Sequence, residues 1–85
     1  MQVISSKDNE IIKNIRKLKE KKYRDIENSY IIEGIKIVKE AIEEKATIKQ
    51  IVVCEECIND GELDKDTLYE IAKYNLIYVT KKVFD

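Results

Sequence analysis

The chain of 85 residues has no histidine and no proline, and it has only two glycines and two cysteines. Without histidine it lacks the side chain that most often serves as a general base or a metal ligand. Two glycines are too few for a glycine-rich phosphate loop or a dinucleotide fingerprint. Two cysteines do not make a disulfide framework, so a reducing cytoplasm is the expected location. These absences predict no catalytic residues and no metal site, and indicate a chain that binds something rather than transforms it.

Long apolar runs are also absent. No stretch approaches the roughly 18 apolar residues that a membrane-spanning helix needs. Residues 5–8 are polar, so the start of the chain has no apolar region of the kind found in secretory signals. We therefore expect no membrane partner. A chain of 85 residues with 44% hydrophobic side chains is sufficient for one small domain with a single core.

Charge is unevenly distributed along the chain, although the formal net charge is only −1. Residues 1–24 carry eight cations and three anions, whereas residues 25–85 carry eight cations and fourteen anions. A local cluster of Lys and Arg can bind nucleic acid whatever the total charge of the protein. The N-terminal third is therefore the informative part of the sequence.

The spacing of apolar residues predicts alternating helices and strands. A first helix, capped by Ser5 or Ser6, has an apolar face made of Ile11, Ile12, Ile15 and Leu18. After a polar turn at 24–28, short apolar runs predict strands at 29–33, 48–54 and 76–79. Helices are predicted between them, over 35–43 and after a cap at Asp64 or Asp66. This alternation predicts an α/β fold, a three-layer α/β/α sandwich with a small, mainly parallel or mixed sheet.

The first predicted helix has a polar, basic face opposite its apolar one. That face contains Asn9, Lys13, Arg16 and Lys17, and further cations follow at Lys21, Lys22 and Arg24. Such a face is often only a solvated helix surface. The alternative is that its cations neutralise the phosphates of a folded RNA without reading its sequence. The amide of Asn9 could add hydrogen bonds to sugar or base edges.

The order of these motifs resembles one known family. The resemblance rests on Ser6-Lys7-Asp8-Asn9, Lys13, the basic run ending at Arg24, and Tyr30-Ile31-Ile32-Glu33-Gly34. It continues through the next apolar helix to Ile51-Val52-Val53-Cys54-Glu55-Glu56, and so covers essentially the whole chain. In this order the motifs look like the N-terminal substrate-binding domain of the SpoU (TrmH-type) RNA 2′-O-ribose methyltransferases.

The resemblance implies a fold similar to that of the ribosomal proteins that bind kink-turn RNA. It also implies that residues 1–85 form one domain that recognises ribosomal or transfer RNA. In the family this domain precedes a catalytic domain that binds S-adenosylmethionine and methylates a ribose hydroxyl. We expect the 85 residues alone to lack that activity and any cofactor, and a homodimer of the parent enzyme, which would act in rRNA processing, to form through the second domain.

Ten residues are predicted to contact RNA: Lys7, Asn9, Lys13, Arg16, Lys17, Lys21, Arg24, Glu33, Gly34 and Lys36. Gly34 would let the RNA backbone approach, and Glu33 would accept a hydrogen bond, with Arg24 as the candidate donor. The alternative for both is structural, a strand end followed by a sharp turn. Lys36 falls in the first turn of a helix, where backbone N–H groups favour a phosphate.

Other patterns leave alternatives open. Tyr23 lies beside the basic run and could stack on a base, whereas Tyr30 and Tyr78 fall in strand patterns and are predicted to be core. Cys54 and Cys57 have the spacing of a redox or zinc motif, but acidic neighbours oppose a thiolate, and zinc needs four ligands. The second functional hypothesis is a protein-interaction or dimerisation domain that uses the acidic C-terminal two-thirds without RNA contact.

Overall fold

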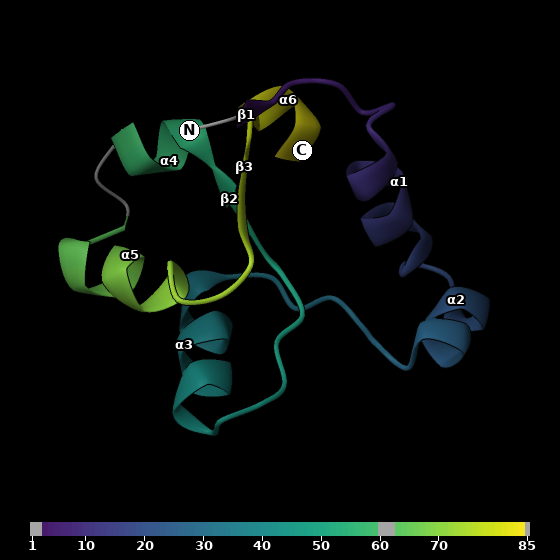
Figure 1. The fold of residues 1–85 in the computed structure, drawn as a ribbon, viewed down its shortest axis with the longest axis horizontal. Coiled ribbons are helices and arrows are strands. Elements are labelled where there is room, and N and C mark those ends of the chain that lie inside the picture. The colour runs from purple at the N-terminus through teal and green to yellow at the C-terminus, as the bar shows by residue number, and fades with distance from the viewer. Residues whose placement is uncertain (1–2, 60–62, 85) are drawn as a thin grey trace.

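A three-stranded parallel sheet forms the centre of the computed structural model, which describes residues 3–59 and 63–84 (Figure 1). Its strands are β1 (Val3–Ile4), β2 (Ile51–Cys54) and β3 (Leu76–Val79), in the order β1-β3-β2. In the register Val3 lies opposite Tyr78, and Ile51 lies opposite Leu76. The predicted strand over 76–79 is therefore confirmed, the strand predicted over 48–54 is confirmed over 51–54, and the small parallel sheet of an α/β fold is confirmed as well.

Helices make the connections that parallel strands require. Between β1 and β2 lie α1 (Glu10–Lys17), α2 (Lys21–Glu27) and α3 (Ile35–Glu43). Between β2 and β3 lie α4 (Glu55–Asn59) and α5 (Lys65–Ile71), and α6 (Lys81–Phe84) follows β3. Figure 1 shows α1 and α2 at one end of the molecule and α3 and α5 at the other. The sheet thus lies between the basic helices α1 and α2 on one side and α3 and α5 on the other.

Apolar side chains cover both faces of the sheet, because successive residues of a strand point to opposite sides. On one face the fully buried Val79 packs with Ile12 of α1 and Val83 of α6. On the other face Ile51 packs with Ile71 of α5. Helices therefore enclose the sheet from two sides, which agrees with the predicted three-layer arrangement.

The segment 29–33, predicted as a strand, is instead an extended stretch outside the sheet of the described chain. Tyr30, predicted to be core, has an exposed fraction of 75%, although Tyr78 packs in the core as predicted. An apolar, β-branched run shows only that its side chains suit a half-buried sheet, whereas a strand also needs a neighbouring backbone. The place beside β3 is taken by β1, which is too short to show an alternating pattern.

The N-terminal helices also begin and end differently from the prediction. Asn9, rather than Ser5 or Ser6, caps α1, because its Oδ1 accepts a hydrogen bond from the amide of Ile11 at 2.9 Å. The predicted turn at 24–28 belongs largely to α2, which ends at Asn28 with a left-handed backbone (φ 51°). No residue of α2 is buried, so no apolar period marks this helix in the sequence.

Two carboxylates hold helix starts in place. Asp64 caps α5 as predicted, since its Oδ1 accepts a hydrogen bond from the amide of Thr67 at 2.7 Å. Glu56 joins β2 to α6, because its Oε2 accepts from the Cys54 thiol at 3.2 Å and from the Lys81 amide at 2.9 Å. The bond from Cys54 is the main reason that the pKa of Glu56 lies below its usual value, and the Thr67 amide does the same for the pKa of Asp64.

These lowered pKa values predict an acid-sensitive fold. The stabilisation is fully present above the ordinary pKa values, 4.5 for Glu56 and 3.8 for Asp64, and is lost as the pH falls through the lower folded values. In urea unfolding, the free energy should therefore decrease below a pH of about 4.5. A variant with Glu56→Gln and Asp64→Asn should show a smaller decrease. An equally steep decrease in the variant would contradict the assignment.

Candidate functional site

The outer surface of α1 carries two exposed lysines, Lys13 and Lys17. Ile12 is buried against β3 and fixes the rotation of the helix about its axis. At about 100° per residue, positions 13 and 17 lie about 40° apart on the side that faces away from the sheet. Lys7 is exposed in the turn that precedes the helix. The structure therefore brings three of the predicted RNA contacts to the surface in this region.

Arg16 is held by the fold, and its predicted position on the outer basic face is wrong. Its Nη2 donates a hydrogen bond to the carbonyl oxygen of Val83 at 2.8 Å, and its side chain is half-buried. The physical reason is helix geometry, because position 16 lies only about 40° from the buried position 12. Asn9 is likewise engaged in the fold through its capping bond to the amide of Ile11.

The first turn of α2 adds further cations, Lys21 and Lys22, next to Lys17 at the end of α1. Lys21 is exposed and forms an ion pair with Asp25 at 2.7 Å. An exposed pair of this kind stabilises little, so a phosphate can compete with Asp25 for Lys21. The ammonium groups of Lys17 and Lys22 lie 5.6 Å and 5.5 Å from the centre of the Tyr23 ring. Tyr23, predicted as a stacking residue, therefore gathers cations at the junction of α1 and α2.

Arg24 connects the two helices. Its Nη1 donates hydrogen bonds to the carbonyl oxygens of Leu18 at 3.0 Å and Lys19 at 2.8 Å. These carbonyls lie just beyond α1, where helical hydrogen bonding ends. Among the described residues, the hydrogen bonds of Arg24 go to these carbonyls and not to Glu33, the predicted acceptor. The guanidinium thereby fixes the corner between α1 and α2.

A hollow of about 450 Å³ opens beside this corner; we call it the corner hollow. Its lining brings together residues that directly follow α1, one residue of α2, and the extended stretch before α3: Leu18, Lys19, Arg24, Tyr30, Ile31 and Glu33. Two predicted site residues, Arg24 and Glu33, thus share one cavity. The other four lining residues are not among the predicted contacts, and Tyr30 and Ile31 were missed because the pattern of residues 29–33 predicts a strand. No pattern in the sequence distinguishes an exposed Tyr-Ile pair from a buried one.

Gly34 and Lys36 lie at the start of α3. Gly34 precedes the helix with φ 112°, a conformation that favours glycine, and a Cβ there would meet nothing within 4 Å. Its structural role is therefore to turn the backbone. Lys36 is exposed, but α3 packs through Ile42 on the face of the sheet opposite to α1. In Figure 1, α3, which carries Lys36, lies apart from α1, which carries Lys13 and Lys17.

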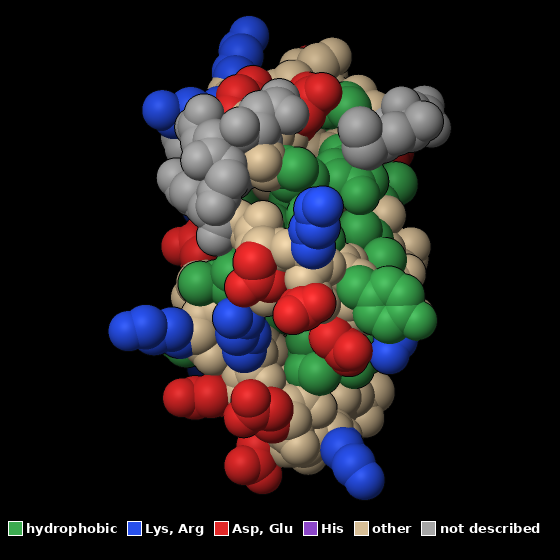
Figure 2. All heavy atoms as spheres, turned by 90° about the vertical axis from the view of Figure 1, so that its left-hand side faces the viewer, with side chains coloured by type: hydrophobic (Ala, Val, Ile, Leu, Met, Phe, Trp, Pro, Cys, Tyr) green, Lys and Arg blue, Asp and Glu red, His purple; other side chains and the backbone are tan. Residues whose placement is uncertain are grey.

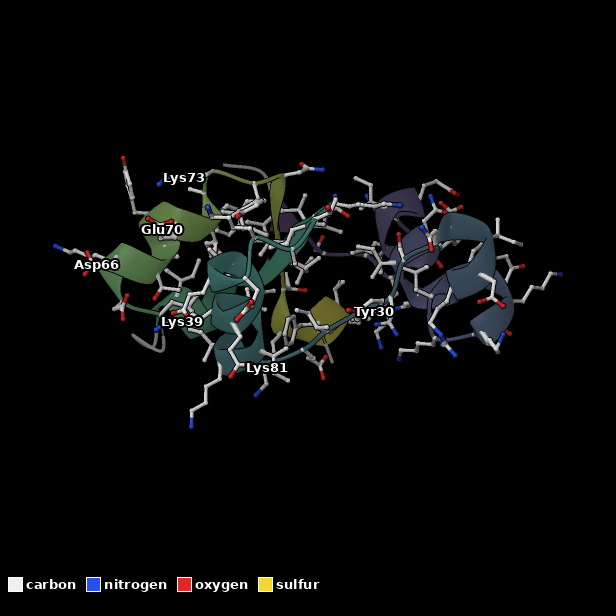
Figure 3. All side chains as sticks on the ribbon, turned by 90° about the horizontal axis from the view of Figure 1, so that it is seen from below. Tyr30, Lys39, Asp66, Glu70, Lys73 and Lys81 are labelled. Carbon is white, nitrogen blue, oxygen red and sulfur yellow. The ribbon has the colours of Figure 1, made fainter. Side chains whose placement is uncertain are left out.

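The surface over α3 and α5 is mixed and rich in carboxylates (Figure 2). A second hollow there, of about 320 Å³, is lined by Lys39, Ile42, Glu43, Asp66, Thr67 and Glu70. Figure 3 shows Lys39, Asp66 and Glu70 on these two helices. Carboxylates repel phosphate groups, so this surface is unfavourable for a nucleic acid backbone.

Within residues 3–59 and 63–84, no group of three or more His, Cys, Asp or Glu residues could hold a metal ion. Cys54 is buried and free, and the side chain of Cys57 lies outside the described part of the chain. In the same residues, no helix is long and apolar enough to cross a membrane.

The match to a family model covers most of the chain. The model of the MRM3-like substrate binding domain matches residues 9–85, from the cap of α1 onward. No curated protein and no solved structure matches significantly. The matched region includes both basic helices and the corner hollow. The chain therefore belongs to the family of MRM3-like substrate-binding domains, which are the substrate-binding domains of SpoU-type RNA 2′-O-methyltransferases, as its sequence motifs predicted.

Proposed function

We propose that this domain binds a structured ribosomal or transfer RNA through α1 and α2 and positions it for a catalytic domain that methylates a ribose hydroxyl. The observation that carries the proposal is the separation of charge in the fold. From Lys7 to Glu27 the chain has eight Lys and Arg residues and five Asp and Glu residues, whereas α3 and α5 together have three Lys residues and four Asp and Glu residues. Membership of the family supplies the class of substrate.

Four exposed lysines provide the contacts in this proposal: Lys7, Lys13, Lys17 and Lys21. A lysine that neutralises a phosphate releases a condensed counterion, so binding is favourable and depends on salt. Such contacts hold and orient a folded RNA without reading its sequence. S-adenosylmethionine belongs, in this proposal, to the catalytic domain rather than to this one.

The test is a titration of labelled ribosomal RNA fragments and transfer RNA at several salt concentrations, followed by fluorescence anisotropy. Four phosphate contacts predict that log affinity falls against log salt with a slope of roughly −3 to −4. Absence of binding at low salt, or an affinity indifferent to salt, would overturn the proposal. Self-association of the domain without RNA binding would instead favour a protein-interaction role.

A further inference from the structure

We infer that the corner hollow receives one unpaired base of the bound RNA, with Tyr30 as the stacking surface and guanine as the preferred base. This inference rests on the proposed function and adds the part of the RNA that is recognised. It assigns a role to the exposed ring of Tyr30, which phosphate contacts by the exposed lysines do not explain.

Two large apolar side chains are exposed at the corner hollow. Tyr30 is 75% exposed and its neighbour Ile31 is 42% exposed, although both are large enough to contribute to a core. Figure 3 places Tyr30 between the α1–α2 end of the molecule and the rest of the fold. An exposed aromatic ring beside a basic surface is the usual stacking platform for an unpaired base, since every base has a π face.

The corner hollow also contains a hydrogen-bond acceptor, the carboxylate of Glu33. The carboxylate of Glu33 can only accept hydrogen bonds, so a base that faces it must donate them. Guanine donates from two adjacent N–H groups on its Watson–Crick edge, which can meet both oxygens of one carboxylate. That edge is free only when the base is unpaired. The geometry thus favours a loop or bulge over a duplex.

Two cations, Arg24 and Lys19, also line the corner hollow. The two bonds from Arg24 to the end of α1 use Nη1, and a guanidinium carries five N–H donors. The other N–H donors of Arg24 and the ammonium of Lys19 can therefore bind the phosphate of the same nucleotide. At about 450 Å³ the corner hollow falls in the usual size range of sites for small ligands. The hollow between α3 and α5 has no aromatic lining residue and three carboxylates, so it offers no equivalent.

Two RNA hairpins test the inference, one with an unpaired guanosine in its loop and one fully paired along the same length. Tyr30→Ala should weaken binding of the first hairpin by roughly 5- to 150-fold, the usual effect of losing a stacked base. Binding of the paired RNA should stay unchanged. Tyr69→Ala is the matched control, because Tyr69 is 70% exposed but lies on α5. Tyr30→Phe should preserve binding, since it keeps the ring.

The preference for guanine is tested with inosine, which lacks the exocyclic amino group, in the same loop. The unaltered domain should bind the guanosine hairpin more tightly, and Glu33→Gln should remove the difference. Equal effects of Tyr30→Ala on both hairpins, or no effect on either, would overturn the inference while leaving the proposed function intact. Failure of the unaltered domain to bind any RNA at low salt would reject the proposed function itself.

Discussion

Replacement of Lys13 and Lys17 by glutamine should weaken RNA binding by roughly 60-fold at about 0.1 M salt. Both lysines are exposed on one side of α1, and each is expected to neutralise one phosphate. Each contact contributes about 0.9 to the slope of log affinity against log salt, so the slope should fall by about 1.8. Glutamine has nearly the helix propensity of lysine, so α1 should remain folded. Anisotropy titrations at several salt concentrations give both quantities.

The matched control is Lys45→Gln with Lys65→Gln, which changes the net charge equally. Both residues are exposed, but Lys45 follows α3 and Lys65 begins α5, on the carboxylate-rich side. This pair should leave the salt slope unchanged. Equal losses from both pairs would mean that only total charge matters, and the assignment of the interface to α1 would then be wrong.

Arg16→Ala should lower the free energy of unfolding by about 2 kcal/mol, because a hydrogen bond from a charged donor typically contributes about 1.5–3 kcal/mol. The substitution removes the bond to the Val83 carbonyl, which ties α1 to α6 across the buried Val79. The Nε of Arg16 is buried and has no hydrogen-bond partner within the described residues, which keeps the expected loss below the upper end of that range. Urea unfolding followed by circular dichroism measures the change.

Lys13→Ala is the comparison for this prediction, since Lys13 lies on the same helix and is exposed. Its effect on stability should stay within about 0.5 kcal/mol. An Arg16→Ala variant as stable as Lys13→Ala would show that the contact with Val83 contributes nothing. Arg16 and Lys13 are both cations of α1, yet we expect one to act on folding and the other on RNA binding.

The sequence alone predicts those helices and strands whose apolar residues are the ones that the fold buries. Strand β2 is β-branched from Ile51 to Val53 and packs on both faces of the sheet, and α5 is capped by Asp64, one of the two aspartates predicted for that position. The extended stretch at 29–33 has a similar run of residues but no neighbouring backbone, and composition cannot show which runs find a partner. The predicted position of Arg16 on the outer face of α1 is wrong for a related reason, because a long side chain close to an apolar face can turn inward.

The candidate site was predicted only in part. The charge distribution along the sequence predicts cations on the N-terminal helices, and Lys13 and Lys17 are exposed there. The corner hollow needs three separate segments to meet, and it depends on Arg24 bonding to the carbonyls beyond α1. Contacts of that kind follow from tertiary structure. Tyr30 therefore becomes a candidate only when the fold shows that no strand covers it.

The position of β3 at the centre of the sheet has a consequence for how the domain acquires its structure during synthesis. Within residues 3–59 and 63–84, β1 and β2 pair with β3 and not with each other, so Val3 and Ile51 can pair with Tyr78 and Leu76 only after β3 has been made. A ribosome makes the two edge strands, β1 and β2, before it makes the central strand, β3. The nascent chain thus presents two unpaired edges until nearly all of the domain has left the exit tunnel, and contacts over such long separations form slowly. We therefore expect the sheet to form only after β3 has been made, late in the synthesis of the described residues.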